Sequence, residues 1–425
     1  MKYQRYDLNS YNLHLIKTTK FKTVSVLISF KRPIIKEETT IRSMLPLMLL
    51  NSTKEFPSTR LLNIEAERQY GLNLSYNQRR LGNYNVLTFS LNMINEKWTE
   101  KGMFEKNLAF LFDVLFNPNI NNDEFDSKSF NIVQNILYSK LQSIKDDISK
   151  YGIVRMLEEM DEKSPISYRV GYLDDVIKID EKKLYNYYTN MIKSDDIDVL
   201  VLGDIDPIQT KRIFKKAFLI NTIKRNKSDI IIEHTKLRRK LKKVIEKESI
   251  KQAKLTVGFK TMKLSEYERK YVMPIYSRIL GGPSYSKLFR TVREKNSLAY
   301  YIACNYSMPD NLLLVYSGIN KENFDPTLQL IKKEVQNMNK GNITEEEIDN
   351  AKKDVISLYD TIEDNASQSI NYYLSKELLE LDDLKTRKKL IKEVTIDDLK
   401  KVSKKIKIDT AHLLYGDDND EKNKD

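Results

Sequence analysis

Alternation of apolar and polar residues near the N-terminus predicts β-strands. Residues 22–30 place Val24, Val26 and Ile28 on one face, which is typical of a half-buried strand. Four other segments of the first half have a strand-like pattern, and a Gly-Asn turn separates the second of them from the third. These segments are residues 12–18, 72–78, 84–93 and 196–203.

Longer segments with apolar residues three and four positions apart predict helices between these strands. Ser58 is suited to be the N-cap of one helix, and an Asn-Pro pair at residues 117–118 ends another. The predicted helices of the first half are residues 37–51, 58–69, 104–116, 127–146, 150–161, 181–192 and 207–218.

The second half of the chain repeats the order of the first. Residues 253–260 (AKLTVGFK) resemble residues 24–31 (VSVLISFK), and a helix pair, a strand pair and a helix follow each of them. The Ile-Asn pair after the strand pair occurs in both halves, at residues 94–95 and 319–320. The second-half elements are predicted at residues 267–281, 285–294, 298–307, 312–319, 324–337, 345–379, 382–394, 396–406 and 411–416.

Repetition of so many elements in one order predicts two homologous domains in tandem. The fold class is α+β, and each domain is expected to be a mostly antiparallel sheet covered by helices. The predicted boundaries are residues 1–220 for the first domain and 251–417 for the second. Residues 221–250 are predicted to be a linker and residues 418–425 a disordered, charged tail.

Composition favours a soluble protein and limits the kinds of partner that it is expected to bind. The 425 residues carry a net charge of +12, with 40% hydrophobic and 31% charged residues. The charge fits either a lysine-rich coat, which we favour, or an acidic partner. The basic run at residues 236–247 (KLRRKLKKVIEK) contains no aromatic residue on which bases could stack, so nucleic acid is not the expected partner.

The single cysteine, Cys304, excludes an intrachain disulfide and a cysteine-based zinc site. The N-terminus has no apolar region typical of a secretory signal, and the longest apolar runs, about eight residues, are too short to span a bilayer. The sequence therefore predicts a cytoplasmic chain without membrane insertion.

One motif in the second half resembles a known family. Residues 280–302, LGGPSYSKLFRTVREKNSLAYYI, contain a Gly-Gly turn, a Ser-x-Leu-Phe helix start, an Arg-Glu-Lys and a Leu-Ala-Tyr. This is similar to the C-terminal half of the insulinase, pitrilysin and mitochondrial processing peptidase family of metallopeptidases. The order of elements extends the resemblance over the whole chain. It implies that the two domains form an insulinase-like half clamshell.

The resemblance also shows what is missing. Active members carry His-x-x-Glu-His on the first helix of the N-terminal half, with a distal Glu as third zinc ligand. Here Ser43 and Leu47 stand at the two histidine positions, Pro46 at the general base and Asn135 near the distal ligand. The three histidines of the chain are too far apart to form the motif elsewhere, and zinc sites rarely form without His or Cys. We therefore expect no metal or other cofactor in this chain.

Arg293 and Tyr300 are the candidate functional residues. An arbitrary pair of this kind would be a surface arginine at a helix end and a tyrosine packed between layers. The resemblance instead implies that they hydrogen-bond the substrate backbone and the oxyanion at a zinc site, because both side chains are strong donors. The substrate would add a strand to a sheet edge, for which residues 84–93 are the candidate.

Three functions follow from these observations. The leading hypothesis is a non-catalytic subunit of a heterodimeric metallopeptidase, with Arg293 and Tyr300 acting in trans beside the zinc of a paralogous partner. The two chains would enclose a chamber that admits short or unfolded peptides for cleavage or processing, and this chain alone would have no peptidase activity. The alternative is a peptide- or protein-binding scaffold of the same fold, and the third is a nucleic-acid binder that uses residues 236–247.

Overall fold

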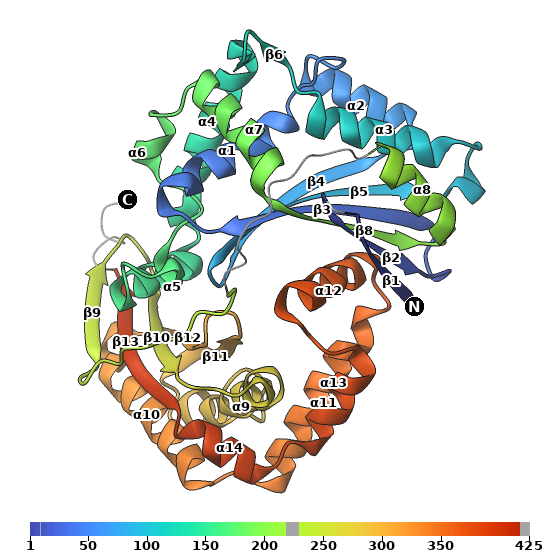
Figure 1. Ribbon diagram of the computed structural model, residues 1–425. Coiled ribbons are helices and arrows are strands. Elements are labelled where there is room, and N and C mark those ends of the chain that lie inside the picture. Colours follow the sequence, from blue (N-terminus) through green and yellow to red (C-terminus); the bar gives the residue numbers. More distant parts are fainter. Residues whose placement is uncertain (9, 218–228, 417–425) are drawn as a thin grey trace, which may run out of the picture. The chain divides into compact units, whose positions relative to one another are not determined.

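The computed structural model describes residues 1–8, 10–217 and 229–416, which form two compact units. Unit 1 comprises Met1–Ser143, Arg169–Ser228 and Ile362–Glu380, and unit 2 comprises the remainder. Each unit is built around its own sheet (Figure 1). The predicted tail, residues 418–425, and residues 221–228 of the predicted linker lie outside the described residues.

Unit 1 contains a six-stranded sheet in the order β1-β2-β8-β3-β5-β4. The central strand β3 is almost fully buried because apolar residues occupy both of its neighbours, and Ile28 lies between Phe89 and Val199. Only β2 and β8 pair in parallel. The strands are β1 (Lys2–Asp7), β2 (Asn12–Lys17), β3 (Thr23–Pro33), β4 (Asn73–Leu81), β5 (Tyr84–Ile94) and β8 (Asp196–Gly203), with a separate hairpin of β6 (Ile120–Asn121) and β7 (Glu124–Phe125).

Helices of unit 1 begin where the sequence supplies caps. The predicted N-cap Ser58 is confirmed, since its hydroxyl accepts a hydrogen bond from the Leu61 amide at 3.4 Å. The elements are η1 (Lys36–Glu38), α1 (Thr39–Leu49), α2 (Thr59–Arg68), η2 (Glu96–Trp98), α3 (Met103–Phe116), α4 (Ser127–Gln142), α6 (Leu173–Val176), α7 (Glu181–Ser194), α8 (Pro207–Ala217) and α12 (Ala366–Leu379).

Unit 2 contains a five-stranded sheet in the order β11-β12-β10-β13-β9. Its strands are β9 (Lys242–Lys247), β10 (Ala253–Thr261), β11 (Ala299–Ser307), β12 (Leu312–Ile319) and β13 (Ile406–Tyr415). Its helices are α5 (Ile148–Met160), η4 (Pro165–Ser167), η5 (Glu268–Val272), α9 (Met273–Leu280), η6 (Phe289–Lys295), η7 (Lys321–Asn323), α10 (Phe324–Lys340), α11 (Glu345–Ile362), α13 (Leu384–Glu393) and α14 (Ile396–Ser403), and η3 (Ser143–Asp146) bridges the two units along the chain.

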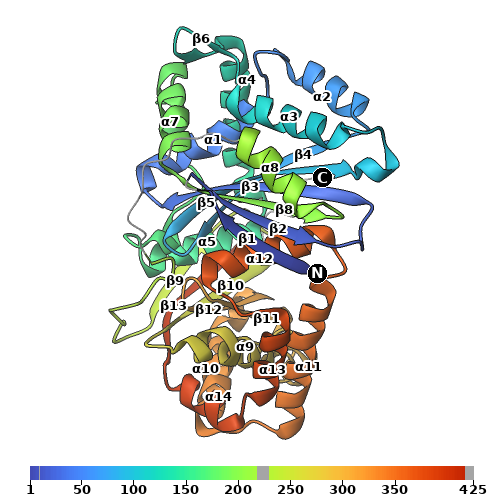
Figure 2. The same cartoon turned by 45° about the vertical axis from the view of Figure 1, so that its right-hand side comes forward.

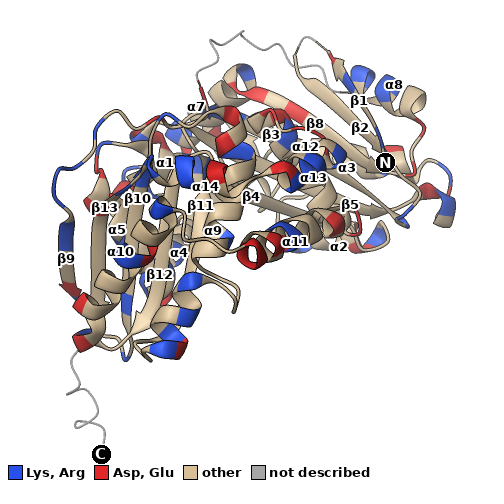
Figure 3. Ribbon diagram, turned by 90° about the horizontal axis from the view of Figure 1, so that it is seen from below, with Lys and Arg blue, Asp and Glu red and all other residues tan. Residues whose placement is uncertain are grey.

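Five strands of the unit 1 sheet have the same order as the five strands of the unit 2 sheet, as the internal repeat predicts, and β1 has no counterpart among the described strands. β10 takes the central place of β3, and β12 and β13 flank it as β5 and β8 flank β3. β9 pairs in parallel with β13, as β2 does with β8, so part of the predicted linker is a strand. Lysine residues recur along β9, and lysine and arginine residues occur in the segment before it (blue in Figure 3). The predicted class of antiparallel-dominated sheets covered by helices is confirmed.

Each unit takes one α-helix from the other half of the sequence. α5 precedes the predicted linker but packs on β10 and β13, where Gly258 leaves room for it; a Cβ there would lie 2.2 Å from the Met160 methyl carbon. α12 follows the linker but packs on β8 and β3 (Figures 1 and 2). The compact units are therefore interleaved along the chain, and the boundaries 1–220 and 251–417 stay predictions.

Candidate functional site

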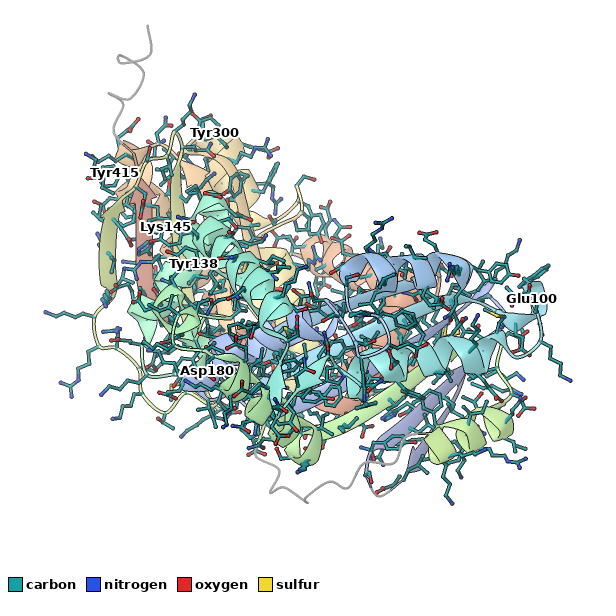
Figure 4. The ribbon with its side chains drawn as sticks, turned by 90° about the horizontal axis from the view of Figure 1, so that it is seen from above. Glu100, Tyr138, Lys145, Asp180, Tyr300 and Tyr415 are labelled. Carbon is teal, nitrogen blue, oxygen red and sulfur yellow. The ribbon has the colours of Figure 1, made fainter. Side chains whose placement is uncertain are left out.

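Tyr300 stands on a β-bulge at a free edge of the unit 2 sheet. Among the described strands β11 pairs only with β12, and the register shifts between Ala299 and Tyr301, so Tyr300 is the extra residue. A bulge re-aims the side chain it carries, and Tyr300 is 57% exposed (labelled in Figure 4). Its hydroxyl donates to Oδ1 of Asn320 at 3.1 Å. The ring is thus held at the surface with its oxygen in a fixed place.

Arg293 lies in η6, on the other side of the helix-to-strand corner. The helix has π geometry, which often occurs at functional sites. The guanidinium stacks on the Phe289 ring, 4.7 Å from its centroid, and makes no hydrogen bond or ion pair with any residue that the structure describes. Arg293 is exposed, so its donors remain available to an anion.

The corner between the two residues has a defined backbone. Ser297 adopts a left-handed conformation with φ of 49°, and the Leu298 amide donates to the Val292 carbonyl at 3.0 Å. Together these turn the chain from η6 into β11. Arg293 and Tyr300 therefore flank one helix-to-strand corner, as their spacing predicts.

The Gly-Gly pair of the motif is required by the structure. A Cβ on Gly281 would lie 2.8 Å from Cβ of Cys304 and 3.1 Å from its nitrogen, closer than packed atoms approach. Gly282 has a φ of 128°, which residues with a Cβ rarely adopt. These glycines let α9 end directly against β11, the strand that carries Tyr300.

The degenerate metal positions are on α1 and α4 of unit 1. The Ser43 hydroxyl is engaged with the Val170 carbonyl, and Pro46 and Leu47 have no donor atom in their side chains. Asn135 is exposed on α4, which packs against α1. Zinc needs histidine, cysteine or carboxylate ligands, so these four residues do not fit a zinc ion.

The prediction that residues 84–93 form the edge strand for substrate is wrong. β5, which covers residues 84–93, lies between β3 and β4, so the edge strand on this side of the described sheet is β4 (Asn73–Leu81), and β1 is the edge strand on the other side. The apolar run of β5 is typical of an interior strand, whereas the many polar side chains of β4 are typical of an edge. That difference in polarity is the sequence signal that distinguishes the edge strand β4 from the interior strand β5.

One group of metal-type side chains in the described part of unit 1 comes from distant residues, His14, Asp198 and Glu377. The His14 ring lies 3.2 Å from the Asp198 carboxylate. Lys31 also pairs with Asp198 at 2.6 Å, and Arg5 pairs with Glu377 at 3.1 Å. Both carboxylates are thus neutralised already, and a metal ion would have to displace these cations. We interpret the group as a buried ion-pair network.

Comparison with known proteins identifies the family. A model of the Peptidase M16 inactive domain matches residues 178–355. The chain is also 32% identical over 411 residues to a Bacillus subtilis (strain 168) protein named probable inactive metalloprotease YmfF, and 95% of each protein is covered. The chain belongs to the M16 peptidase family. The resemblance to insulinase, pitrilysin and the mitochondrial processing peptidase is confirmed by these matches.

Two further relatives of this M16 homologue are informative. It is 29% identical over 168 residues to YmxG of the same bacterium, named an uncharacterized zinc protease, with 38% of this chain and 39% of that protein covered. A conserved protein from Enterococcus faecalis V583 has a solved structure with a TM-score of 0.90 and 25% identity, covering 98% of this chain and 99% of that one.

Two findings support a non-catalytic pseudopeptidase. The relative YmfF is named a probable inactive metalloprotease, and this chain has lost zinc-ligand chemistry at Ser43, Pro46, Leu47 and Asn135. Across residues 1–8, 10–217 and 229–416, no helix is both long and apolar enough to cross a membrane.

The sequence did not identify the roles of Phe289 and Asn320, whose side chains contact Arg293 and Tyr300. Neither the spacing nor the composition of the chain indicates such contacts.

Proposed function

We propose that this chain is the non-catalytic subunit of a heterodimeric zinc metallopeptidase, in which Arg293 and Tyr300 bind the substrate at the active site of a zinc-bearing M16 partner. One observation supports this most directly. The chain keeps an exposed, fixed arginine and tyrosine in unit 2, while its own zinc-ligand positions in unit 1 have lost their chemistry. An exposed donor pair without a metal of its own fits a role in another chain.

The chemistry of the pair suits the oxyanion of peptide hydrolysis. Arg293 offers charged N–H donors, and Tyr300 offers a neutral O–H donor. Donors placed where negative charge develops can each contribute about 3–4 kcal/mol to the transition state. Asn320 accepts from the Tyr300 hydroxyl, so that hydroxyl would rotate its hydrogen toward the substrate when an oxyanion is present.

The partner would be an M16 paralogue that carries His-x-x-Glu-His, and zinc would reside there. The relatives named above support such a pairing, since one bacterium encodes both a probable inactive metalloprotease and a zinc protease of this family. Short or unfolded peptides would be the substrates. A cytoplasmic location remains a prediction from the sequence.

The test combines the purified chain with a zinc-bearing M16 paralogue from the same organism and measures cleavage of an unstructured fluorogenic peptide. We expect Arg293→Ala and Tyr300→Phe each to lower kcat of the mixture about a hundredfold while the two chains still associate. Lys295→Ala, exposed on the same helix, and Tyr301→Phe, the next residue of β11, are matched controls. Full activity of both Arg293→Ala and Tyr300→Phe would refute the proposal.

Metal analysis of the chain purified alone provides an independent check. The residues at the four degenerate positions predict well under one zinc ion per chain. Stoichiometric, tightly bound zinc would contradict the assignment of the metal to the partner.

A scaffold function is the second candidate, and α4 supplies the observation that favours it. Ile132 and Ile136 flank Asn135, and each is 45% exposed. Lys140, in the last turn of the same helix, donates to the Tyr76 hydroxyl of β4 at 3.3 Å, so the end of α4 reaches this edge strand. An apolar helix face beside a free edge suits an extended peptide. Peptide binding with no cleavage by any zinc-bearing paralogue would favour this function.

A further inference from the structure

Unit 1 contains a pocket that neither the zinc positions nor the Arg293–Tyr300 pair explains. It has a volume of about 300 Å³ and lies between the start of α3, the turn after β5 and the start of α8. That volume is at the lower end of ligand pockets and is sufficient for one large side chain. Val24, Phe104 and Ile213 give it an apolar lining.

Three carboxylates line the same pocket, those of Glu96, Asp204 and Asp206. Asp204 is neutralised by an ion pair with Lys97. The other two carboxylates accept only backbone hydrogen bonds, Glu96 from the Phe104 amide at 3.1 Å and Asp206 from the first turn of α8. Neither of these two carboxylates forms an ion pair with a described residue, although, in addition to these backbone hydrogen bonds, the nearby charge of Lys17 lowers the pKa of the Asp206 carboxyl group.

Asp206 is ionised at neutral pH. Its carboxylate accepts the Gln209 and Ile208 amides at 2.9 and 2.8 Å, and these hydrogen bonds hold its pKa below the usual range. The second carboxylate oxygen makes no hydrogen bond within the described part of the chain. It is thus available to a donor in the pocket.

Thr210 is a second, independent sign of a ligand. It is only 3% exposed and lines the pocket, yet its hydroxyl makes no hydrogen bond with any described residue. The Thr210 hydroxyl oxygen is not among the fully buried atoms that lack a partner, so it opens into the pocket, where water can be its partner. A polar group entering the pocket would replace that water.

Large apolar side chains next to lining residues suggest a macromolecular ligand. Ile208, between Asp206 and Gln209 in the sequence, is 82% exposed, and Trp98, next to Lys97, is 64% exposed. Exposed tryptophan and isoleucine beside a pocket are typical of a surface that a partner covers. A free small molecule would fill the pocket and leave these side chains in water.

We propose that this pocket binds the lysine or arginine side chain of a peptide segment, whose flanking apolar residues cover Trp98 and Ile208. The aliphatic stem of a lysine or arginine would lie on the apolar lining, and its charged end would reach Glu96, Asp206 and the Thr210 hydroxyl. This site is independent of the proposed function, because it uses none of the residues assigned to catalysis.

The test exploits the fact that Trp98 is the only tryptophan of the chain, so its fluorescence reports on the pocket. The full chain is titrated with an acetylated, amidated pentapeptide that has leucine at both ends and arginine at the centre. A matched peptide has glutamine at the centre, and isothermal titration calorimetry measures both affinities. We expect saturable binding of the arginine peptide and at least tenfold weaker binding of the glutamine peptide.

Variants then locate the binding. Asp206→Asn keeps the helix cap, because Asn caps as well as Asp, and Glu96→Gln keeps an acceptor for the Phe104 amide. The double variant is expected to bind the arginine peptide at least tenfold more weakly. Asp180→Asn, which changes another exposed N-cap of unit 1 (labelled in Figure 4), is the control and should bind normally.

Three results would overturn the proposal. They are no saturable binding of the arginine peptide, equal binding of the glutamine peptide, and unchanged binding by the double variant. Circular dichroism of each variant confirms that the fold is intact.

Discussion

The hydroxyl of Tyr300 donates a hydrogen bond to Oδ1 of Asn320 at 3.1 Å, and this bond joins the bulge of β11 to the residue that follows β12. Both residues are exposed, so the bond adds little to folding. Its effect is to orient a tyrosine that the bulge has already turned outward. The same contact makes Asn320 a positioning residue for the proposed activity.

Asn320→Leu is expected to remove this orientation. We predict a change in the free energy of unfolding within about 0.5 kcal/mol, because the site is exposed. In the mixed peptidase, kcat should fall about fivefold, less than for Tyr300→Phe, which removes the donor itself. Asn320→Asp keeps an acceptor oxygen but adds a negative charge beside the developing oxyanion, so it should also lower kcat. If the Asn320→Leu variant were as active as the unaltered chain, the hydrogen bond between Tyr300 and Asn320 would have no role in the peptidase activity.

Asp195 is expected to dominate the stability of unit 1. Its carboxylate lies 2.7 Å from Arg42 and 3.3 Å from Arg32, and all three side chains are buried. Asp195→Ala would leave the buried Arg42 guanidinium without its anion, while Arg32 would keep its pair with Glu38, and the change should cost about 3–5 kcal/mol. Urea unfolding followed by Trp98 fluorescence measures this.

An exposed ion pair of the same unit provides the comparison for Asp195. Asp364 pairs with Lys20 at 3.2 Å, and the two side chains are 74% and 49% exposed. Asp364→Ala should change the free energy of unfolding by less than about 1 kcal/mol. Similar costs for Asp195→Ala and Asp364→Ala would contradict the assignment of unit 1 stability to the buried pair.

Asp198 makes unit 1 sensitive to acid. Burial by itself would raise the pKa of this carboxyl group, but the Lys31 ammonium and the His14 ring outweigh it and hold the pKa well below its usual range. A carboxyl with a depressed pKa in the folded state contributes stability above its unfolded pKa of about 3.9, and that contribution is lost as pH falls.

The Asp198→Asn variant should therefore lose stability less steeply than the unaltered chain between about pH 5 and pH 3. It should also be less stable at pH 7, because Lys31 is left buried without its anion. Urea unfolding at a series of pH values tests both statements, with Asp364→Asn as the exposed control. Parallel pH profiles for the chain and the Asp198→Asn variant would rule out this role.

Gly281→Ala should loosen the strand that carries Tyr300. The added methyl group would meet Cys304 on β11, and overpacking of this kind costs about 1–3 kcal/mol. Cys304 itself reports the change, because burial raises the pKa of its thiol and shields it from reagents. Labelling of the thiol by Ellman's reagent should be at least about fivefold faster in the variant.

Gly102→Ala is the control for the Gly281 variant. It strains the backbone of unit 1, because Gly102 has a φ of 91°, but nothing lies within 4 Å of the added Cβ. It should leave the labelling rate of Cys304 unchanged. If Gly281→Ala also left that rate unchanged, the close approach would not constrain β11.

Local patterns predicted most of the fold. The alternation of Val24, Val26 and Ile28 located β3, and the repeat correctly predicted a second sheet whose five strands follow the same order. The edge was misjudged, because the pattern of one strand does not say which strands lie beside it. Local patterns also could not predict which sheet α5 and α12 pack on. Each helix has an apolar face, and such a face would fit either sheet equally well.

The sequence by itself determined the repeat, the family motif and the loss of zinc-ligand chemistry, because each depends on which side chains are present and in what order. The tertiary structure alone decided three other features. It turned Tyr300 outward on a bulge, brought Asn320 to its hydroxyl, and gathered Glu96, Asp206 and Thr210 around one pocket. These features depend on contacts between residues far apart in the chain, and such contacts form only when the strands and helices pack.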